Sequence, residues 1–148
     1  MSFTITRLTP TLLTTQFTSY CETLNNLSKI GDLTLENALS VLQRSDTSWS
    51  AIFVALDDTN HEIIASWTLL IEPTFWRWGK NAAHIENIVT RKWYEWQGIG
   101  KAIMQSIIDY AKTQDCYKII GDCDDELVWR YEKFWFKKDG AFIRQYVD

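Results

Sequence analysis

HIENIV at residues 84–89, followed closely by EWQGIGK at residues 95–101, is the part of the sequence that decides the fold. The first segment is rich in apolar residues and reads as a strand, and the second brings Gly98 and Gly100 to the start of a helix. A helix N-terminus offers backbone N–H groups without internal partners, together with the positive end of the helix dipole. The two segments therefore predict a strand, a glycine-bearing loop and a helix that form an anion site.

The residues of this loop exclude two common phosphate-binding motifs. Gly100-Lys101 is followed by Ala102, whereas the P-loop of nucleoside triphosphatases requires Ser or Thr at that position. The dinucleotide-binding pattern G-x-G-x-x-G is absent as well. The loop therefore points to another class of phosphate-bearing ligand.

The remaining elements follow from the spacing of apolar residues and from turn-forming residues. Thr9-Pro10 and Thr34 are typical of helix starts, and the turn formers at residues 57–60 predict a hairpin. The predicted helices cover residues 10–24, 35–42, 98–111 and 127–134, and the predicted strands cover residues 50–56, 62–70, 83–89, 117–122 and 141–147. This order predicts an α/β domain with a mixed sheet.

Length and composition set further limits. The chain has 148 residues, of which 46% are apolar and 23% charged, and this predicts one domain over residues 1–148. A net charge of −4 argues against a nucleic-acid partner, because phosphate backbones are bound by clustered Lys and Arg. No apolar run approaches the roughly 18 residues of a membrane span, and the first residues do not resemble a signal peptide. We therefore expect a cytoplasmic protein with no membrane partner.

The cysteines and histidines do not predict a metal centre or a disulfide framework. Cys21, Cys116 and Cys123 lack the spacing of either, and neither His61 nor His84 has a second ligand at metal-binding spacing. We expect reduced thiols and no metal. A nucleophilic pair of Cys123 with His84 is an alternative, but an inert buried cysteine is the more common case.

Residues 95–100 resemble the pyrophosphate loop of the GNAT acetyltransferases, whose pattern is Arg or Gln, two residues, Gly, one residue, and Gly or Ala. Other segments resemble one family within that superfamily, the glucosamine-6-phosphate N-acetyltransferases: CYKIIGDCD at residues 116–124, RYEK at residues 130–133 and, more faintly, residues 24–34. The resemblance implies the GNAT fold, with a mixed, mostly antiparallel central sheet, a splayed parallel strand pair and flanking helices. It also implies the order strand, two helices, three antiparallel strands, helix, strand, helix, strand.

This resemblance implies an acetyl-CoA-dependent N-acetyltransferase that works by direct attack of the amine, with no acyl-enzyme. The implied acceptor is a small amino-sugar phosphate, glucosamine 6-phosphate, and the implied assembly is a homodimer. Two alternatives stay open. One is an acetyltransferase for another amine, such as a different amino sugar, a polyamine or a protein, and the other is a catalytically silent acyl-CoA-binding domain.

The coenzyme contacts implied by the resemblance are mostly backbone contacts. Strand residues pair with the pantetheine arm, and loop residues bind the pyrophosphate. Lys101 adds a positive charge near the phosphates, with a solvated helix lysine as its alternative interpretation. The implied coenzyme-binding residues are Ile88, Val89, Thr90, Trp96, Gln97, Gly98, Ile99, Gly100, Lys101 and Tyr131.

The chemistry of acetyl transfer needs a base for the amine, N–H donors for the oxyanion and a proton donor for the departing thiolate. Tyr131, Glu86 and Asp122 are the predicted catalytic residues. Tyr131 stands at the position of the family's catalytic tyrosine, and a phenol with a pKa near 10 is able to protonate a thiolate. Glu86 lies among apolar strand residues, where a carboxylate without a partner is costly to bury. The alternatives are a core tyrosine, an exposed strand Glu and a strand-end Asp.

The acceptor site is predicted from residues on several elements. The cluster FWRWGK at residues 75–80 contains Arg77 and Lys80, which are suited to a sugar phosphate, and its alternative role is a hairpin tip that meets a second subunit. The family also uses an arginine of the C-terminal strand across a dimer; the aligned residue is Tyr146, and Arg144 is the nearest arginine. The predicted substrate-binding residues are Glu86, Asn87, Arg77, Tyr117, Lys118 and Arg144.

Besides Tyr146, four residues depart from the family pattern. Asn87 replaces the usual Asp, which removes a negative charge from the acceptor site, and Glu95 replaces Gln or Arg, which adds a negative charge near the phosphates. Trp96 replaces a small residue. Trp135 replaces the usual Gly, so we expect the turn after Tyr131 to be made differently.

Overall fold

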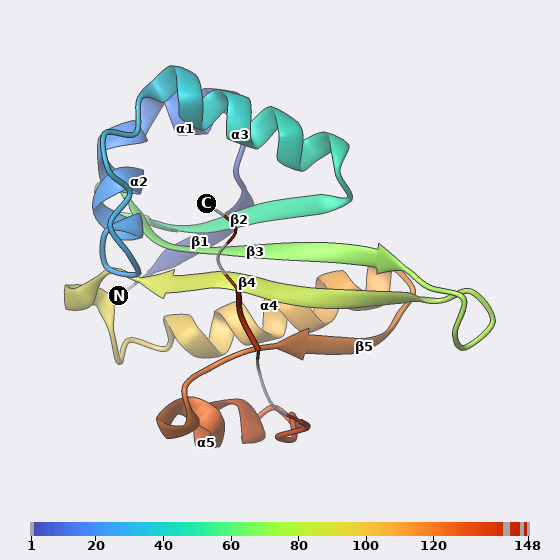
Figure 1. The fold of residues 1–148 in the computed structure, drawn as a ribbon. Coiled ribbons are helices and arrows are strands. Elements are labelled where there is room, and N and C mark those ends of the chain that lie inside the picture. Colours follow the sequence, from blue (N-terminus) through green and yellow to red (C-terminus); the bar gives the residue numbers. More distant parts are fainter. Residues whose placement is uncertain (1, 141–142, 146, 148) are drawn as a thin grey trace.

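One sheet of five strands runs through the described part of the chain, which is residues 2–140, 143–145 and 147 of a computed structural model. The strands are β1 (Phe3–Arg7), β2 (Ser50–Asp57), β3 (Ile63–Pro73), β4 (Asn81–Thr90) and β5 (Cys116–Gly121). They lie side by side in chain order (Figure 1). The first four are antiparallel neighbours, and β5 is parallel to β4. The predicted mixed, mostly antiparallel sheet is confirmed.

Helices flank this sheet on both faces. They are α1 (Pro10–Thr15), α2 (Phe17–Leu24), α3 (Leu35–Thr47), α4 (Ile99–Thr113) and α5 (Val128–Glu132). The helices α1, α2 and α3 lie on one face and α4 on the other, while α5 lies beyond β5 (Figure 1). Within the described residues, no helix combines the length and apolar character needed to cross a membrane.

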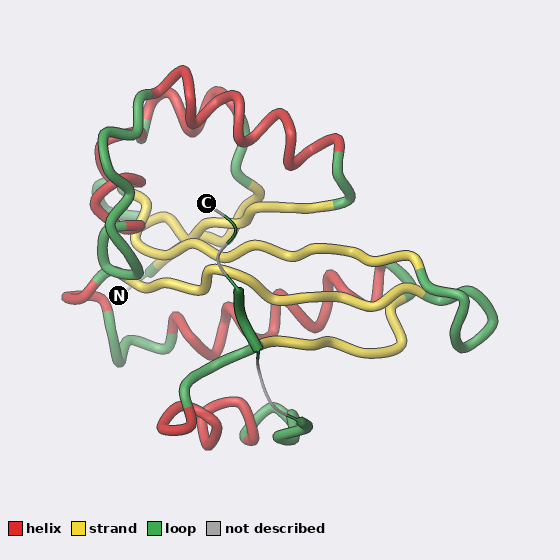
Figure 2. Tube along the Cα trace, in the orientation of Figure 1, coloured by secondary structure: helices red, strands yellow, loops and turns green. Residues whose placement is uncertain are grey.

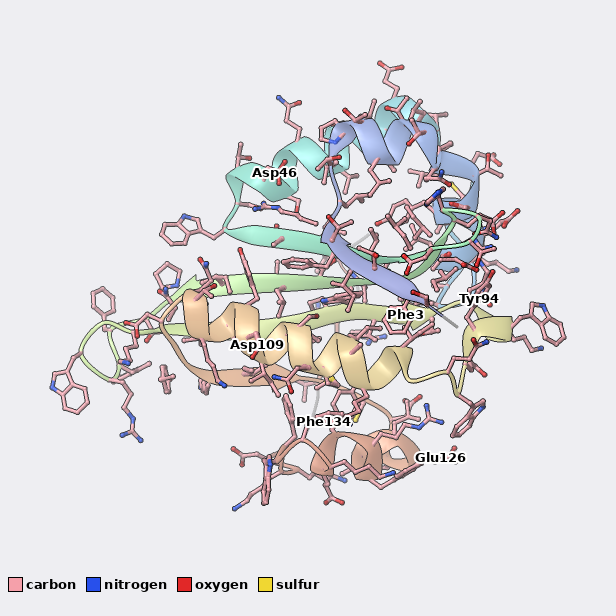
Figure 3. The ribbon with its side chains drawn as sticks, turned by 180° about the vertical axis from the view of Figure 1, so that it is seen from behind. Phe3, Asp46, Tyr94, Asp109, Glu126 and Phe134 are labelled. Carbon is pink, nitrogen blue, oxygen red and sulfur yellow. The ribbon has the colours of Figure 1, made fainter. Side chains whose placement is uncertain are left out.

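The helix α4 is held to the sheet by one apolar stripe. Ile99, Ile103, Ile107 and Ala111 recur every four residues, which places them on one side of the helix, and all four are buried. Figure 3 shows α4 lying across the back of the sheet, with the exposed Asp109 on the helix. The buried residues of the sheet in this cluster are Ala55, Ile64, Ala65, Trp67, Leu69, Ile71, Ala83 and Ile85. This packing fixes the start of α4 relative to β4.

The opposite face of the sheet is only partly covered. A second apolar cluster, which includes Leu13, Leu42 and Ile52, joins α1 and α3 to β2 and the start of β3. Farther along the strands, Leu70 of β3 and Ile120 of β5 are 40% and 39% exposed. The face of β3, β4 and β5 opposite α4 is therefore open to solvent near its centre.

The first helical region is divided where the sequence predicts one helix over residues 10–24. Gln16, between α1 and α2, has φ −114° and ψ 21°, outside the α-helical range. The break lets α2 dock on β3: the Ile63 N–H donates to the Ser19 hydroxyl at 3.1 Å, and the Thr23 hydroxyl donates to the Ile63 carbonyl at 2.6 Å. Apolar spacing does not reveal this break, because apolar residues continue on both sides of it.

The C-terminal segment differs from the strand predicted over residues 141–147. Residues 143–145 and 147 have no strand structure, and Ala141, Phe142 and Tyr146 lie outside the described residues. A strand is stabilised by ladder hydrogen bonds to a neighbour. In the described residues the five-stranded sheet ends at β5, so no ladder to this segment extends it.

The core position of α4 predicts a large difference between two adjacent isoleucines. Ile107 is fully buried and Ile108 only half-buried. Ile107→Ala should lower the free energy of unfolding by about 2–5 kcal/mol, because it removes apolar contacts and leaves a cavity, whereas the matched control Ile108→Ala should cost clearly less. Urea denaturation of both variants measures the difference. Equal losses would contradict this orientation of α4.

Candidate active site

A β-bulge interrupts β4 at Asn87. Four residues of β4, Glu86–Val89, lie opposite three residues of β3, Ser66–Thr68, so Asn87 and Ile88 have no register partner on β3. Asn87 has φ 55°, in the left-handed region that Asn tolerates better than most residues. The bulge therefore takes the backbone at Asn87 and Ile88 out of the regular ladder, on the strand that carries Glu86.

The strands β4 and β5 separate in the middle of β4. Their parallel register begins at Asn81 opposite Cys116 and ends at Ile85 opposite Gly121, after which β4 continues to Thr90. Figure 2 shows β5, in yellow, stopping partway along β4 before the green chain turns toward α5. The second half of β4 thus has an edge that β5 does not cover. This confirms the predicted splayed parallel pair.

The N-terminus of α4 has no side-chain cap. Its N-cap residue is Gly98, with φ 84°, and the first backbone bond of the helix runs from the Ala102 N–H to the Gly98 carbonyl at 3.2 Å. The N–H groups of residues 99–101 therefore have no partner within the helix. The side chains of Thr9 and Thr34 cap α1 and α3. The uncapped helix start follows β4 after the connection formed by residues 91–98, where the sequence predicts the anion site.

Both glycines of the loop face open space. A Cβ added to Gly98 or Gly100 would meet no atom within 4 Å. Gly98 is required by its positive φ, but Gly100 has ordinary backbone geometry, so neither packing nor conformation explains its missing side chain. Glu95 and Lys101, on either side of the glycines, are both exposed.

Tyr131 is half-buried on α5, against the core beneath α4. Its ring meets the ring of Phe136 edge to face, with centroids 5.8 Å apart. Burial raises the pKa of the Tyr131 phenol, the charges of Cys123 and Asp122 raise it further, and Arg130 opposes them. At neutral pH the phenol is therefore protonated and able to donate a hydrogen bond or a proton.

The segment after β5 places Asp122 and Cys123 near this phenol, and both are exposed. Partial burial, followed by the charges of the neighbouring aspartates, raises the pKa of the Cys123 thiol. A raised pKa disfavours the thiolate that a nucleophile needs, so these surroundings of Cys123 do not favour the alternative nucleophilic pair with His84. In the described residues, no group of three or more His, Cys, Asp and Glu side chains is arranged to hold a metal ion.

Glu86 and His84 lie on the face of β4 opposite α4. Residues of a strand alternate between faces, and the intervening Ile85 is buried in the cluster beneath α4. His84 Nε2 lies 2.8 Å from a carboxylate oxygen of Glu72. The register also sets His84 between two half-exposed apolar residues of neighbouring strands, Leu70 and Ile120. Glu86 is thus half-buried beside the bulge, at the edge of the open face.

The predicted phosphate-binding residues lie toward the other end of β4. Arg77 is exposed in the connection between β3 and β4, and Lys80 forms a 2.9 Å ion pair with Asp115. From Asn81 to Glu86 the strand extends about 17 Å, at about 3.3 Å per residue. Arg77 and Lys80 are therefore not brought next to Glu86 in the single chain.

Lys118 is the predicted basic residue that shares the open face with Glu86. Lys118 lies opposite Ala82 in the register, two residues before His84, and its exposed side chain has Nζ 5.4 Å from the centroid of the Tyr117 ring. Arg144 is exposed in the described C-terminal segment, and Tyr146 lies outside the described residues.

The turn after α5 contains Trp135, which stands in place of the family's usual Gly. Trp135 has φ 69°, so a tryptophan takes the left-handed conformation that a glycine adopts more easily. The Phe136 N–H donates to the Tyr131 carbonyl at 3.4 Å, and the Trp135 N–H to the Glu132 carbonyl at 3.0 Å, the pattern of a Schellman cap. The helix end is therefore made with a residue that is strained in this conformation.

One contact beside the loop was not foreseen from the sequence. The Arg130 guanidinium carbon lies 5.2 Å from the centroid of the Trp96 ring, which joins α5 to the loop before α4. The RYEK segment contains Arg130, but the resemblance implies a role only for Tyr131 in that segment. Nothing in the sequence pairs Arg130 with Trp96, because the fold alone brings the two segments together.

Comparison with known proteins agrees with this geometry. The model of the acetyltransferase (GNAT) family matches residues 19–135. The chain is 30% identical to a glucosamine 6-phosphate N-acetyltransferase of Candida albicans over 131 residues, which cover 87% of each chain. It is 35% identical to one of Trypanosoma brucei brucei over 75 residues, which span 51% of each chain. The second match thus covers about half the length of that relative.

A solved structure extends the likeness to the whole fold. The crystal structure of glucosamine-6-phosphate N-acetyltransferase from Arabidopsis thaliana superposes with a TM-score of 0.91, at 26% identity, and covers 100% of both chains. The overall fold of the chain is therefore shared with that enzyme.

The surroundings of Tyr131 predict a late ionisation. Its phenol should titrate above the ordinary value of about 10, because burial and nearby negative charges oppose the phenolate. The difference between the ultraviolet absorbance titrations of the wild type and Tyr131→Phe isolates this group. Asp122→Asn should move the Tyr131 pKa downward, since it removes one of those charges. A Tyr131 pKa below 10 in the otherwise unchanged protein would contradict this environment.

Proposed function

Because the chain belongs to the acetyltransferase (GNAT) family, we propose that it transfers the acetyl group of acetyl-CoA to the amine of glucosamine 6-phosphate. One observation carries this proposal. The uncapped start of α4, the bulge at Asn87 and the end of the β4–β5 pairing are consecutive along one strand–loop–helix unit, and Tyr131 lies just beyond β5. An acyl-CoA arm needs these features in this order.

The coenzyme-binding part of the proposal rests on backbone groups. The free N–H groups at residues 99–101, with the open glycines before them, suit the pyrophosphate. The uncovered edge of β4 at residues 88–90 suits the pantetheine arm, whose amides pair with a free strand edge as an added strand does. Lys101 offsets the charge that Glu95 sets near the phosphates.

The reaction requires two proton movements. The acceptor nitrogen attacks the thioester carbonyl carbon, so a C–N bond forms, the C–S bond breaks, one proton leaves the nitrogen and one reaches the sulfur. Glu86 accepts the amine proton, directly or through a water molecule, and the Tyr131 phenol donates to the sulfur. The N–H groups at the bulge stabilise the negative charge on the carbonyl oxygen. Solvent then restores both side chains, and Asp122 positions the amine.

The acceptor is proposed from the relatives and from the open face of the sheet. The Candida and Arabidopsis relatives are named for glucosamine 6-phosphate. Here, Glu86 and Lys118 lie on one face, Glu86 beside the bulge and Lys118 farther back along β5. A carboxylate suits the amine, and an ammonium group suits the phosphate.

Asn87 supports a second class of acceptor. Asn87 is neutral at a position where the family carries Asp, which lowers the negative charge offered to an amine. A GNAT enzyme for another amine, such as a polyamine or a peptide amine, is therefore the second candidate.

We also propose that the enzyme is a cytoplasmic homodimer. Leu70 and Ile120 support the dimer, because they leave apolar surface on the open face beside the acceptor residues. A second copy seated there would cover this surface and bring its own basic residues near the acceptor phosphate.

The role of Tyr131 predicts a specific kinetic defect. Tyr131→Phe removes only the hydroxyl, so kcat should fall about 10²-fold while the affinity for acetyl-CoA stays within about threefold. The release of CoA thiol and a calorimetric titration measure the two quantities. Tyr110→Phe is the matched control. Tyr110 lies on α4 and its ring packs on the Phe53 ring, so the Tyr110→Phe variant should keep full activity. Unchanged turnover in Tyr131→Phe would reassign Tyr131 to packing.

The acceptor proposal predicts a preference for the phosphorylated sugar. Glucosamine 6-phosphate should exceed glucosamine by at least about tenfold in kcat/KM, since a charge-assisted contact contributes more than a neutral one. Lys118→Ala should narrow this gap, and the control Lys112→Ala, at the end of α4, should leave it unchanged. A panel of amines incubated with acetyl-CoA tests the preference. Acetylation of spermidine or a peptide amine, with neither sugar used, would move the assignment to the second acceptor class.

A further inference from the structure

Two indoles and two cations gather beside the loop before α4. We call Trp96, Trp129, Arg130 and Lys133 the indole–cation cluster. The Arg130 guanidinium carbon lies 5.2 Å from the Trp96 centroid and 5.5 Å from the Trp129 centroid, and Lys133 Nζ lies 4.3 Å from the Trp129 centroid. Figure 3 shows the two chain segments at one end of the molecule, where Tyr94 leads toward α4 and Glu126 leads toward α5. The cluster thus bridges the predicted pyrophosphate loop and α5.

Trp96 is held in an exposed and strained position. Its side chain is 85% exposed, and its φ of 67° is a backbone conformation that bulky residues rarely adopt. Packing does not account for a large apolar side chain placed this way, because most of the indole faces solvent. A ligand that stacks on the indole would account for it.

The two cations of the cluster are available to an anion. The ion pairs formed by the described residues include neither Arg130 nor Lys133, whereas the nearby Lys138 is paired with Asp125 at 2.7 Å. Both cations sit over indole rings, which hold them in place without neutralising their charge. The chain has a net charge of −4, so two neighbouring positive charges next to a helix N-terminus form a local site that favours a ligand with more than one phosphate.

We propose that the indole–cation cluster binds the 3′-phosphorylated adenosine end of coenzyme A. This inference rests on the proposed function, because it takes the pyrophosphate to lie at the start of α4. The adenosine is attached directly to that pyrophosphate, so it must lie near the loop. Arg130 and Lys133 bind the 3′-phosphate, and the exposed Trp96 indole stacks on the adenine.

The chemistry of the cluster matches this ligand group by group. A guanidinium pairs with two phosphate oxygens at once, and an ammonium adds a second charge. An indole gives a purine a large stacking surface, and such stacking is indifferent to base identity, which suits a site that recognises its ligand chiefly by the phosphate. The coenzyme would thus be held at its nucleotide end by side chains and along its arm by backbone groups.

The test compares coenzyme A with 3′-dephospho-coenzyme A by calorimetric titration. The wild type should bind coenzyme A at least about tenfold more tightly, because only coenzyme A carries the 3′-phosphate. In Arg130→Ala this ratio should fall to below about threefold. Lys92→Ala is the matched control, since Lys92 also sits over an exposed indole, that of Trp93, at 6.0 Å, and it should keep the wild-type ratio.

A second pair of variants tests the proposed contact between Trp96 and the adenine. Trp96→Ala should weaken the binding of both ligands by about fivefold or more and leave their ratio unchanged, as expected for lost stacking. Trp93→Ala, which removes an indole of similar exposure, should change neither affinity. Full affinity in Trp96→Ala would overturn the stacking role.

Two results would overturn the phosphate role. One is equal binding of both ligands by the wild type. The other is an Arg130→Ala variant that loses affinity for both ligands equally, which would show that Arg130 only ties α5 to the loop. The outcomes also separate this inference from the proposed function. Acetyl transfer without discrimination against the dephospho compound overturns the inference alone, and selective binding of coenzyme A without transfer to any amine overturns the proposed function alone.

Discussion

β4 is paired along both edges over its first half and along one edge over its second half, and the site depends on this change. Backbone N–H and C=O groups near a core need partners, and the ladder to β5 stops supplying them at Ile85. The bulge at Asn87 removes a further stretch from the ladder to β3. A segment of β4 beside Glu86 is thereby left with backbone N–H and C=O groups that are able to form hydrogen bonds with an extended ligand. Tyr131 belongs to the same domain.

The helix α4 supplies the proposed anion site. Parallel strands need a crossover, and α4 provides it by returning the chain from the end of β4 to the start of β5. Its stripe of isoleucines is buried against the sheet, so the position of its N-terminus is set by the core and not by the loop. The loop is then free to consist of glycines and exposed side chains. In an acidic protein, the N–H groups without partners in the helix create a local positive field that suits the proposed phosphate.

The surroundings of Tyr131 follow from the same arrangement. Since β5 stops early, the chain turns away and the segment after it carries Asp122 and Cys123 past α5. The phenol is packed against the core, and its acidity is lowered by burial and by these neighbours. A proton donor suited to a thiolate thus arises from packing as much as from residue type. The strained Trp135 ends the helix that carries it, at a position where glycine would be easier.

The sequence by itself determined most elements of this protein and their order, because apolar periodicity, helix caps and turn formers act over a few residues. It also predicted an anion site from Gly98 and Gly100, which are read directly, and a catalytic role for Tyr131 through its resemblance to a family. Only the tertiary structure decided the break at Gln16, the bulge at Asn87 and the meeting of Arg130 with Trp96. Each of these depends on contacts between segments far apart in the chain: α2 docks on β3, β4 shifts its register against β3, and α5 approaches the loop before α4. Local patterns carry no information about such distances, because burial and register are set only when the whole sheet is assembled.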